Sequence, residues 1–323
     1  MKRISCIVAV MTYALPFLPL TSVSAQAKDL QIALLMPTQS TGYWARFLDA
    51  FRKEADARGV KVDLKGNNYS AQEQASQVDQ TLAQRPDVIV LVPVDSSALV
   101  PSIRKIHQAG IPLVISNSQP DSKYANFWNV FTGPDDIGNG KTGAEAFVKG
   151  LDEKKLPHKG DIFIIEGILG TPPQIQRSEG FEARIKELAP EINIVGKMPG
   201  DWDAVKSEAV ASALFTQHKN VLGVYAHDDD MMKGIITAAK RQGLDASKLV
   251  LVGHNCNPSG LMAINAGDQY ATVGQSPFDD GAFALRAAAD VAEGKADEKV
   301  RYLPHPAVSK SNISECWADG LND

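Results

Sequence analysis

Short apolar runs alternate along this chain with longer stretches in which apolar residues recur at helical spacing. Residues 30–36 form one such run, which leaves no gap for solvent on either face. That pattern predicts a parallel strand that is covered on both sides. A helical stretch follows at 44–58, and Gly59 ends it. The same order of strand and helix then repeats as far as residue 294.

The alternation predicts the α/β fold class with two doubly wound parallel sheets. The predicted strands are 30–36, 60–64, 88–92, 113–115, 162–165, 192–195, 221–225, 249–252 and 271–273. The predicted helices are 44–58, 70–84, 95–109, 136–149, 173–188, 204–215, 230–242, 259–266 and 279–293. Ser70 and Glu73 fit a capping box, and Asp95 is expected to cap the helix that begins there. The chain of 323 residues is longer than one ordinary core needs, so two domains are expected.

The loops that follow the predicted strands are the places where a ligand is expected. In doubly wound sheets, ligands collect at the carboxyl ends of the strands. These loops carry Asn, Asp, Gln, Thr, Tyr and Trp side chains, which suit the recognition of hydroxyl groups, although polar loops are common in any protein. The loops are 37–44, 93–97, 116–120, 167–177, 200–203, 226–230, 253–258 and 274–277.

The first twenty-five residues have the layout of a secretory signal peptide. A basic start at 1–3 precedes an apolar run at 4–20, and Val23 and Ala25 offer a small-x-small cleavage site before polar sequence begins. We therefore expect cleavage after Ala25 and a mature chain of residues 26–323.

A membrane helix is the alternative for this segment. It would need about 20 unbroken apolar residues, whereas Pro16 and Pro19 interrupt the run. Cys6 lies too early for a lipoprotein cleavage site, so the mature protein is expected to be soluble and to work outside the cytosol.

Charge and cysteine content narrow the function further. Removal of Lys2 and Arg3 with the leader leaves 31 basic against 38 acidic residues, with no basic stripe, so nucleic acid is not an expected partner. Two cysteines remain, Cys256 and Cys316. In an oxidising compartment such a pair can join, but two separate buried thiols are equally compatible with the sequence, which leaves both open.

Two motifs mimic cofactor sites. Residues 138–143 match the dinucleotide-binding pattern Gly-x-Gly-x-x-Gly, but Pro134, Asp135 and Asp136 fill the turn where that pattern needs its first glycine. Carboxylates at a helix start would also repel a pyrophosphate. The better interpretation is a helix whose glycines allow close helix–sheet packing.

The run of three aspartates at 228–230 lacks the alternating spacing of a calcium loop, and helix capping explains at least one of them. His227 and His254 have no second ligand at zinc spacing, and no Gly-x-Ser-x-Gly elbow is present. We expect neither a metal nor a cofactor, and no enzymatic activity.

Several short segments, in order and spacing, resemble the periplasmic sugar-binding proteins of ABC transporters, in particular the ribose-binding type. LacI-type repressors share that core but begin with a DNA-binding helix-turn-helix, where this chain has its signal peptide. The segments that carry the resemblance are 32–34, 43–44, 51–55, 90–95, 167–171, 177–181 and 227–231.

The resemblance implies two Rossmann-like lobes joined by a hinge, formed by residues 26–134 plus 276–304 and by residues 135–275 plus 305–323. It also implies a periplasmic, monomeric solute-binding protein that closes on a sugar or polyol and delivers it to the permease of an ABC importer. A sensing protein that presents its closed form to a membrane receptor is the alternative. An exported enzyme on the same fold is a third possibility, because fold alone does not determine function.

The resemblance also implies a set of ligand contacts. Tyr43 and Trp44 would stack on the ligand, because ring faces suit the apolar C–H patches of a sugar, and Trp202 would oppose them from the second lobe. The alternative for Tyr43 and Trp44 is packing against the helix that they open. Position 175, where the family has an arginine, also belongs to the set. The remaining expected contacts are Thr41, Asn117, Ser118, Ile175, Asp228, Asn255 and Gln275.

The chain departs from the ribose-binding pattern in its charged positions. The family has an Asp-Arg pair at 117–118, an arginine at 175, an aspartate at 255 and an asparagine at 228. Most charged hydrogen bonds to sugar hydroxyls are therefore lost, which favours a neutral ligand with fewer ring hydroxyls, a linear polyol or a more apolar compound. Asp228 is the expected charged acceptor, unless it only caps the following helix, and Arg177 is assigned to structure.

Overall fold

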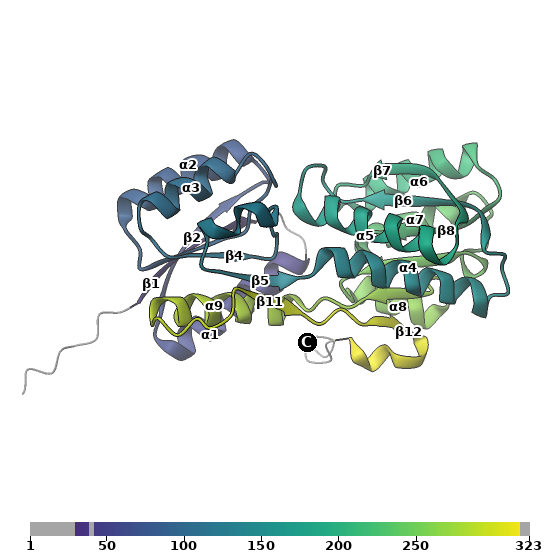
Figure 1. The fold of residues 1–323 in the computed structure, drawn as a ribbon. Coiled ribbons are helices and arrows are strands. Elements are labelled where there is room, and N and C mark those ends of the chain that lie inside the picture. The colour runs from purple at the N-terminus through teal and green to yellow at the C-terminus, as the bar shows by residue number, and fades with distance from the viewer. Residues whose placement is uncertain (1–29, 39–41, 317–323) are drawn as a thin grey trace, which may run out of the picture.

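The computed structural model describes residues 30–38 and 42–316, which form two lobes of strands and helices (Figure 1). The expected cleavage site after Ala25 and the expected ligand contact Thr41 lie outside the described residues. In the described part of the chain, no helix is both long and apolar enough to span a membrane.

The first lobe is a six-stranded, wholly parallel sheet with the order β11-β5-β4-β3-β1-β2. Helices α2 and α3 cover one face, and α1 and α9 cover the other (Figure 1). The strands are β1 Gln31–Pro37, β2 Lys61–Asn67, β3 Val88–Leu91, β4 Leu113–Ser116, β5 Val130–Pro134 and β11 Val300–Leu303. The helices are α1 Gly42–Arg58, α2 Ala71–Gln84, α3 Val100–Gln108, α9 Pro277–Ala292 and the short 3-10 helix η1 Ser122–Phe127.

The second lobe repeats this architecture with the order β12-β10-β9-β8-β6-β7, in which β12 is antiparallel to β10. Its strands are β6 Lys159–Glu166, β7 Glu191–Pro199, β8 Val221–Ala226, β9 Val250–His254, β10 Ala271–Val273 and β12 Ala307–Ser309. Its helices are α4 Asp136–Glu153, α5 Pro172–Leu188, α6 Ala204–Gln217, α7 Asp229–Arg241, α8 Pro258–Ala266 and the 3-10 helices η2 Ala246–Lys248 and η3 Lys310–Glu315.

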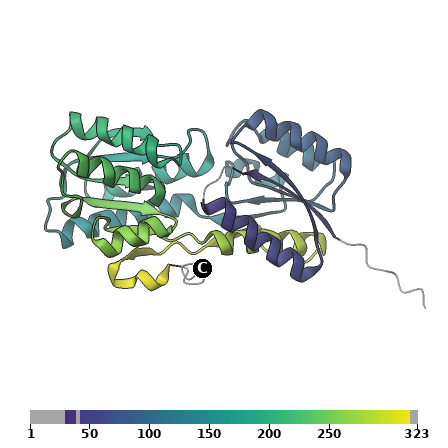
Figure 2. The same ribbon diagram turned by 180° about the vertical axis from the view of Figure 1, so that it is seen from behind.

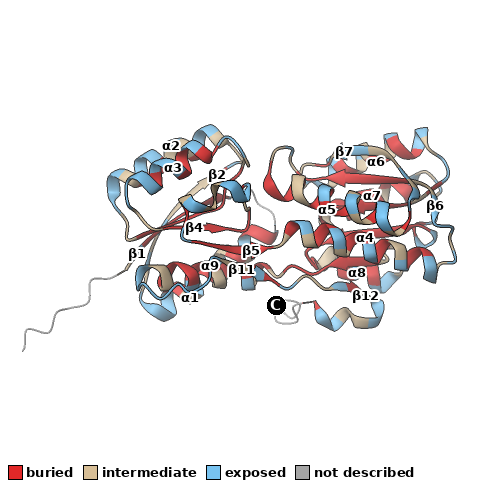
Figure 3. Ribbon diagram, viewed as in Figure 1, coloured by how far each residue is buried: buried red, intermediate tan, exposed pale blue. Residues whose placement is uncertain are grey.

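Strand β1 illustrates why the apolar runs form central strands. Ile32, Leu34 and Met36 pack into the cluster on the α1 and α9 side, whereas Ala33 and Leu35 pack into the cluster on the α2 and α3 side. Because successive side chains point to opposite faces, a strand covered on both sides must be apolar at every position. The central strands of both sheets are accordingly buried (Figure 3).

The described chain passes between the two sheets three times, after β5, after β10 and after β11 (Figures 1 and 2). The second and third crossings are hydrogen-bonded to each other, because Gly274 N donates to Pro306 O at 2.8 Å. Short crossings of this kind let the lobes move relative to each other while they remain joined.

The predicted fold class is confirmed, but the predicted start of α3 is wrong. This helix begins at Val100 rather than at Asp95. The Asp95 carboxylate instead accepts hydrogen bonds from the backbone nitrogens of Ser97 and Ala98 and so closes a separate turn before the helix. Strands β5, β11 and β12 were not predicted. The last two lie at sheet edges and are only partly buried, so they lack the continuous apolar pattern of a central strand.

The glycines of 138–143 lie inside α4, as predicted. Gly143 packs against the Tyr225 ring of β8, in agreement with the predicted helix–sheet packing, whereas Gly140 packs against another helix. Asp135 caps this helix through a hydrogen bond from Gly138 N at 2.9 Å. A Cβ atom at Gly140 would fall 2.3 Å from the carbonyl oxygen of Arg177 on α5, so only glycine allows this approach of the two helices.

Cys256 and Cys316 form a disulfide, with Cα atoms 5.7 Å apart. Cys256 follows β9, and Cys316 follows η3 near the end of the described chain. The bond therefore ties the C-terminal segment to the second lobe and resolves the alternative that the sequence left open.

Candidate ligand-binding site

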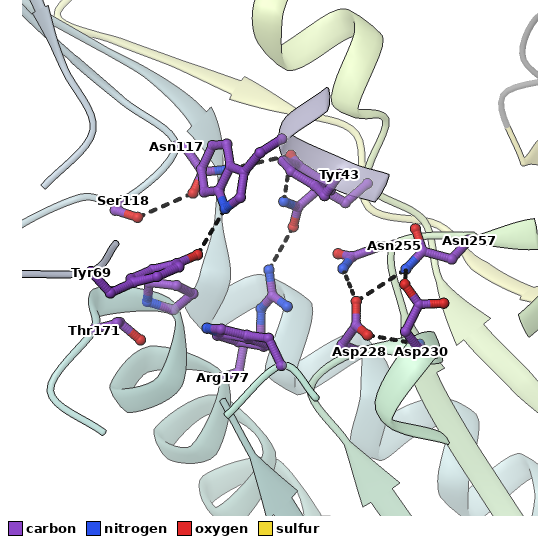
Figure 4. Close-up of a pocket in the computed structure, with 14 residues that line it drawn as sticks. Tyr43, Tyr69, Asn117, Ser118, Thr171, Arg177, Asp228, Asp230, Asn255 and Asn257 are labelled. Carbon is purple, nitrogen blue, oxygen red and sulfur yellow. Dashed lines mark hydrogen bonds between the residues drawn. The ribbon is translucent and has the colours of Figure 1, made fainter. Parts of the chain in front are cut away.

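A pocket lies between the lobes at the carboxyl ends of the parallel strands (Figure 4). It encloses about 590 Å³ of empty space, its open mouth included. Its walls come from both lobes and from the crossing after β10. The lining residues are Tyr43, Trp44, Tyr69, Asn117, Ser118, Thr171, Pro173, Arg177, Trp202, Asp228, Asp230, Asn255, Asn257 and Gln275.

The aromatic wall of the first lobe is held by a hydrogen bond between two of its members. Trp44, in the first turn of α1, donates from Nε1 to the hydroxyl of Tyr69 at 2.8 Å. Tyr69 lies between β2 and α2 with φ of 56°, a conformation that bulky residues rarely adopt. The edge contact of Trp44 with Phe47 shows that this ring also packs against its own helix. Both roles weighed for Trp44 are therefore compatible with its position.

Tyr43 is the centre of a buried polar cluster. Its hydroxyl donates to Asp280 Oδ2 on α9 at 2.8 Å and accepts from Gln275 Nε2 at 2.8 Å. Asn117 Nδ2 donates to the same Asp280 oxygen at 2.7 Å. Burial raises the pKa of Asp280 to about 7, although the hydrogen bonds from Asn117 and Tyr43 act in the opposite direction.

Arg177 extends this cluster into the second lobe. Its guanidinium donates to Asp136 Oδ1 and to Gln275 Oε1, both at 2.8 Å, and to the carbonyl oxygen of His227 at 2.6 Å. The structural role assigned to Arg177 is therefore present, but the side chain also lines the pocket. A continuous series of hydrogen bonds runs from Asp136 through Arg177 and Gln275 to Tyr43.

Trp202 forms the aromatic wall of the second lobe. It lies between β7 and α6 with φ of 60°, and its ring covers Gly167, where a Cβ atom would fall 1.9 Å from Cζ2. The Arg177 guanidinium lies 5.9 Å from the ring centroid. The ring position therefore depends on a glycine beneath it and on a cation beside it.

Asp228 both caps α7 and lines the pocket. One carboxylate oxygen accepts from the backbone nitrogens of Asp230 and Met231 at 2.7 and 3.1 Å. The other accepts from the amide groups of Asn255 and Asn257 at 2.7 and 3.1 Å. Burial, followed by the nearby Asp230 carboxylate, raises the pKa of Asp228 to about 7.

The middle aspartate of the run is separate from the pocket. Asp229 is buried and accepts from Gln269, from the hydroxyl of Thr272 and from the backbone nitrogen of Asn257. Over residues 30–38 and 42–316, no group of three or more His, Cys, Asp or Glu side chains could hold a metal ion.

The structure brings most of the predicted contacts together and separates one of them. The pocket is lined by the predicted residues Tyr43, Trp44, Asn117, Ser118, Trp202, Asp228, Asn255 and Gln275. Ile175 is half-buried and lines an adjoining cavity between the lobes, which also contains Ser96 and Gln176.

Other lining residues were missed by the sequence interpretation. Thr171, Pro173, Arg177, Asp230 and Asn257 all fall in loops that follow predicted strands, so position along the chain was a usable signal for them. Tyr69 also follows a predicted strand, because it lies between β2 and α2, but that loop was not among those in which a ligand was expected.

Comparison with known proteins identifies the family. Residues 32–296 match the periplasmic binding protein domain, and the chain belongs to this family. The ribose import binding protein of Escherichia coli (strain K12) is 29% identical over 296 residues, which cover 91% of this chain and 94% of that protein.

Two solved structures are similar along most of their length. An ABC transporter periplasmic solute binding protein from Actinobacillus succinogenes 130z, with bound D-allose, is 26% identical with a TM-score of 0.79, covering 89% of this chain and 100% of that one. An ABC transporter solute binding protein from Bacillus halodurans C-125, with bound myo-inositol, has a TM-score of 0.82 at 24% identity, covering 90% and 98%. The second structure, at 24% identity, shows a shared fold only.

Proposed function

We propose that this protein is a periplasmic solute-binding protein that binds a small sugar or polyol between its lobes and delivers it to an ABC importer. The observation that carries the proposal is the interlobe pocket itself, in which aromatic rings from both lobes lie beside amide and carboxylate groups. Such a lining suits a ligand with apolar C–H faces and hydroxyl edges. The ribose import binding protein among the relatives, and the D-allose bound in the similar solved structure, agree with this class of ligand.

Closure of the two lobes on the ligand is the proposed mechanism. In the present structure the lobes already touch, because Ser96 N donates to Gly170 O at 3.1 Å and Gln176 Nε2 donates to Gln119 O at 2.8 Å. A ligand that contacts both walls adds its own interactions to this closed form and so increases its population. We place the hinge at the crossings, with lobes formed by residues 26–134 plus 276–304 and by residues 135–275 plus 305–323.

Within this mechanism, Trp44 and Trp202 would hold the ligand from opposite lobes. Amide contacts would come from Asn117, Asn255 and Gln275. Asp228 would accept from the ligand in addition to capping α7, since it is one of the residues that line the pocket.

Mass spectrometry of small molecules released from gently purified protein tests the proposed ligand class. A thermal-shift panel of pentoses, hexoses and polyols provides a second test. A ligand present at about 100 times its Kd stabilises the folded state by about 2.7 kcal/mol, which gives a clear shift in Tm. The absence of any released ligand together with no shift across the panel would contradict the proposal. Chemical turnover of a bound compound would show an enzyme instead.

Export to the periplasm follows from the proposed leader. Intact-mass analysis of the exported protein is expected to give an N-terminus at Gln26. Retention of residues 1–25 would remove the basis of this localisation. Loss of uptake of the identified ligand on deletion of the gene, with an intact permease, would test the role in import.

A further inference from the structure

The interlobe pocket holds more carboxylates than cations. Arg177 is the one basic side chain among the described residues that line it, and it is already paired with the buried Asp136 at 2.8 Å. Asp228 and Asp230 line the same pocket, and Asp280 lies behind Tyr43 and Asn117. These three aspartates form no salt bridge with any residue of the described ranges. In the pocket and directly behind it there are therefore one guanidinium and four carboxylates, those of Asp136, Asp228, Asp230 and Asp280.

The excess negative charge is concentrated at one end of the pocket. The Asn257 amide nitrogen donates to Asp228 Oδ2 at 3.1 Å and to Asp230 Oδ2 at 3.3 Å, so both carboxylates lie around one small group. Ser259 Oγ donates to the other Asp230 oxygen at 2.5 Å. The side-chain donors that contact these two carboxylates are all neutral. Figure 4 shows this acidic end on the far side of the pocket from Tyr69 and Thr171.

The same end also has an acceptor without a donor. Asn257 is 2% exposed, and its amide nitrogen is committed to the two carboxylates, which fixes Oδ1 as an acceptor. This oxygen has no hydrogen-bond partner among the described residues. A buried acceptor is costly when it is left unpaired, so this end of the protein is short of donors and favours a ligand that brings them.

The donor requirement distinguishes an ammonium group from a hydroxyl. A hydroxyl brings one donor together with two acceptor lone pairs, whereas an ammonium brings three donors, no acceptor and a positive charge. Burial of carboxylates is unfavourable unless an opposite charge compensates it, and the raised pKa of Asp228 reflects that cost in the absence of a cation. The aromatic residues of the pocket suit a cation as well, because ring faces attract positive charge.

We propose that the ligand is a small polyhydroxylated amine, whose protonated nitrogen binds at the acidic end of the pocket, against Asp228 and Asp230, while its hydroxyl groups face the amides and aromatic rings. This inference rests on the proposed function, since it specifies the class of polyol that the same pocket takes. It also makes Asp228 and Asp230 the residues that determine specificity for the amine.

Matched ligand triplets test the inference by calorimetry near neutral pH. Each triplet contains an alcohol, the corresponding amine and its N-acetyl derivative, as in glycerol, serinol and N-acetylserinol, or D-glucose, D-glucosamine and N-acetyl-D-glucosamine. An inositol and its monoamino analogue extend the panel to cyclitols. In at least one triplet, the amine is expected to bind about tenfold or more tightly than the alcohol, because charged hydrogen bonds are roughly twice as strong as neutral ones. Acetylation is expected to remove that preference.

Single substitutions then test which carboxylates bind the charged amine. Asp228→Asn and Asp230→Asn are each expected to weaken binding of the amine by about tenfold and to change binding of the alcohol much less. Asparagine also caps helices, so Asp228→Asn is expected to fold, and Tm measurement checks this. Asp245→Asn is the matched control, because Asp245 is an exposed cap of η2 in the same lobe and lies outside the pocket.

The outcomes separate this inference from the proposed function. Alcohols that bind as tightly as their amines in every triplet, or an amine preference that survives both pocket variants, overturn the inference and leave a neutral polyol as the ligand. Failure of every alcohol and every amine to bind overturns both the inference and the proposed sugar or polyol ligand.

Discussion

The Tyr43 hydroxyl lies 2.8 Å from Gln275 Nε2, and this hydrogen bond joins the first helix of the first lobe to a segment in which the chain passes between the lobes. The Oε1 atom of the same Gln275 accepts from Arg177 of the second lobe at 2.8 Å. All three side chains are buried and line the pocket. Residues that a ligand would contact therefore also connect the two lobes at the hinge.

Removal of this hydroxyl should weaken both the fold and the site. In Tyr43→Phe, Gln275 loses an acceptor and Asp280 loses a donor, while the ring remains. We expect a loss of about 1–3 kcal/mol in the free energy of unfolding, because buried polar groups are left unpaired, together with weaker ligand binding. Tyr302→Phe is the matched control, since Tyr302 is 48% exposed and its hydroxyl donates to Gln119 Oε1. Equal losses in the two variants would contradict a special role for Tyr43.

The glycine beneath Trp202 provides a steric test of the aromatic wall. In Gly167→Ala the new Cβ atom must displace the Trp202 ring, whose Cζ2 would otherwise lie 1.9 Å away. Ligand affinity is expected to fall by about tenfold or more, since stacking is worth about 0.5–1.5 kcal/mol beyond buried area and the displaced ring also alters the pocket. Calorimetry on the double mutant with Trp202→Ala provides the control. Additive losses in that cycle would show that the two changes act independently.

The buried Asp280 should make the protein more stable in mild acid. An aspartate in an unfolded chain has a pKa of about 3.9, whereas that of Asp280 in the folded protein is raised to about 7. Between these values the folded state binds a proton that the unfolded state lacks, so the free energy of unfolding falls as the pH rises from about 4 to about 7. Asp228, whose pKa is also raised, acts in the same direction.

Thermal melts of the ligand-free protein across this pH range check the sign. The slope of Tm against pH is expected to be smaller in Asp280→Asn, which keeps the acceptor for Tyr43 and Asn117 and loses the titrating group. The exposed neighbour Asp279 provides the control Asp279→Asn, which should retain the wild-type slope. A Tm that rises with pH in the wild-type protein would show that these carboxyls do not dominate its acid response.

Loss of the disulfide should destabilise the second lobe. The bond closes a loop with a sequence separation of 60 residues, for which the chain-entropy account gives roughly 4 kcal/mol. The variant with both Cys256→Ala and Cys316→Ala is expected to melt at lower temperature, and reductant should lower the Tm of the wild-type protein alone. A thiol assay on the denatured, unreduced mature protein is expected to find no free thiol. Two titratable thiols would show that the bond does not form.

The interlobe hydrogen bond of Gln176 should affect closure more than folding. It donates to the Gln119 carbonyl across the gap between the lobes, so it stabilises the closed arrangement. Gln176→Ala is expected to weaken ligand binding by up to about tenfold, as the net value of one hydrogen bond suggests, with little change in Tm. Solution scattering of the ligand-free variant should show a larger radius of gyration. Gln72→Ala, on the exposed face of α2, is the control.

Local patterns along the sequence determined most of the helices and central strands, and the edge of the sheets where the pocket lies. Buried parallel strands must be apolar on both faces, so runs such as 30–36 and 88–92 identified them directly. Ser70 caps α2, because its hydroxyl accepts from the Glu73 nitrogen three residues away, which is one half of the predicted capping box. Asp95 shows the limit of such local signals, because its carboxylate accepts hydrogen bonds within a turn that precedes α3 and does not cap the helix.

Contacts between distant residues were decided by the tertiary structure. The pairing of Cys256 with Cys316 follows from the antiparallel pairing of β12 with β10, which no local sequence pattern predicts. Tyr43 and Gln275 are separated by 232 positions, and neither residue type specifies the other. Arg177 was assigned to structure, and its ion pair with the buried Asp136 agrees with that role, yet packing of α5 against α4 also places it in the pocket wall. A local pattern constrains neighbours along the chain through backbone geometry, whereas contacts across the hinge depend on how two separately folded sheets come to face each other.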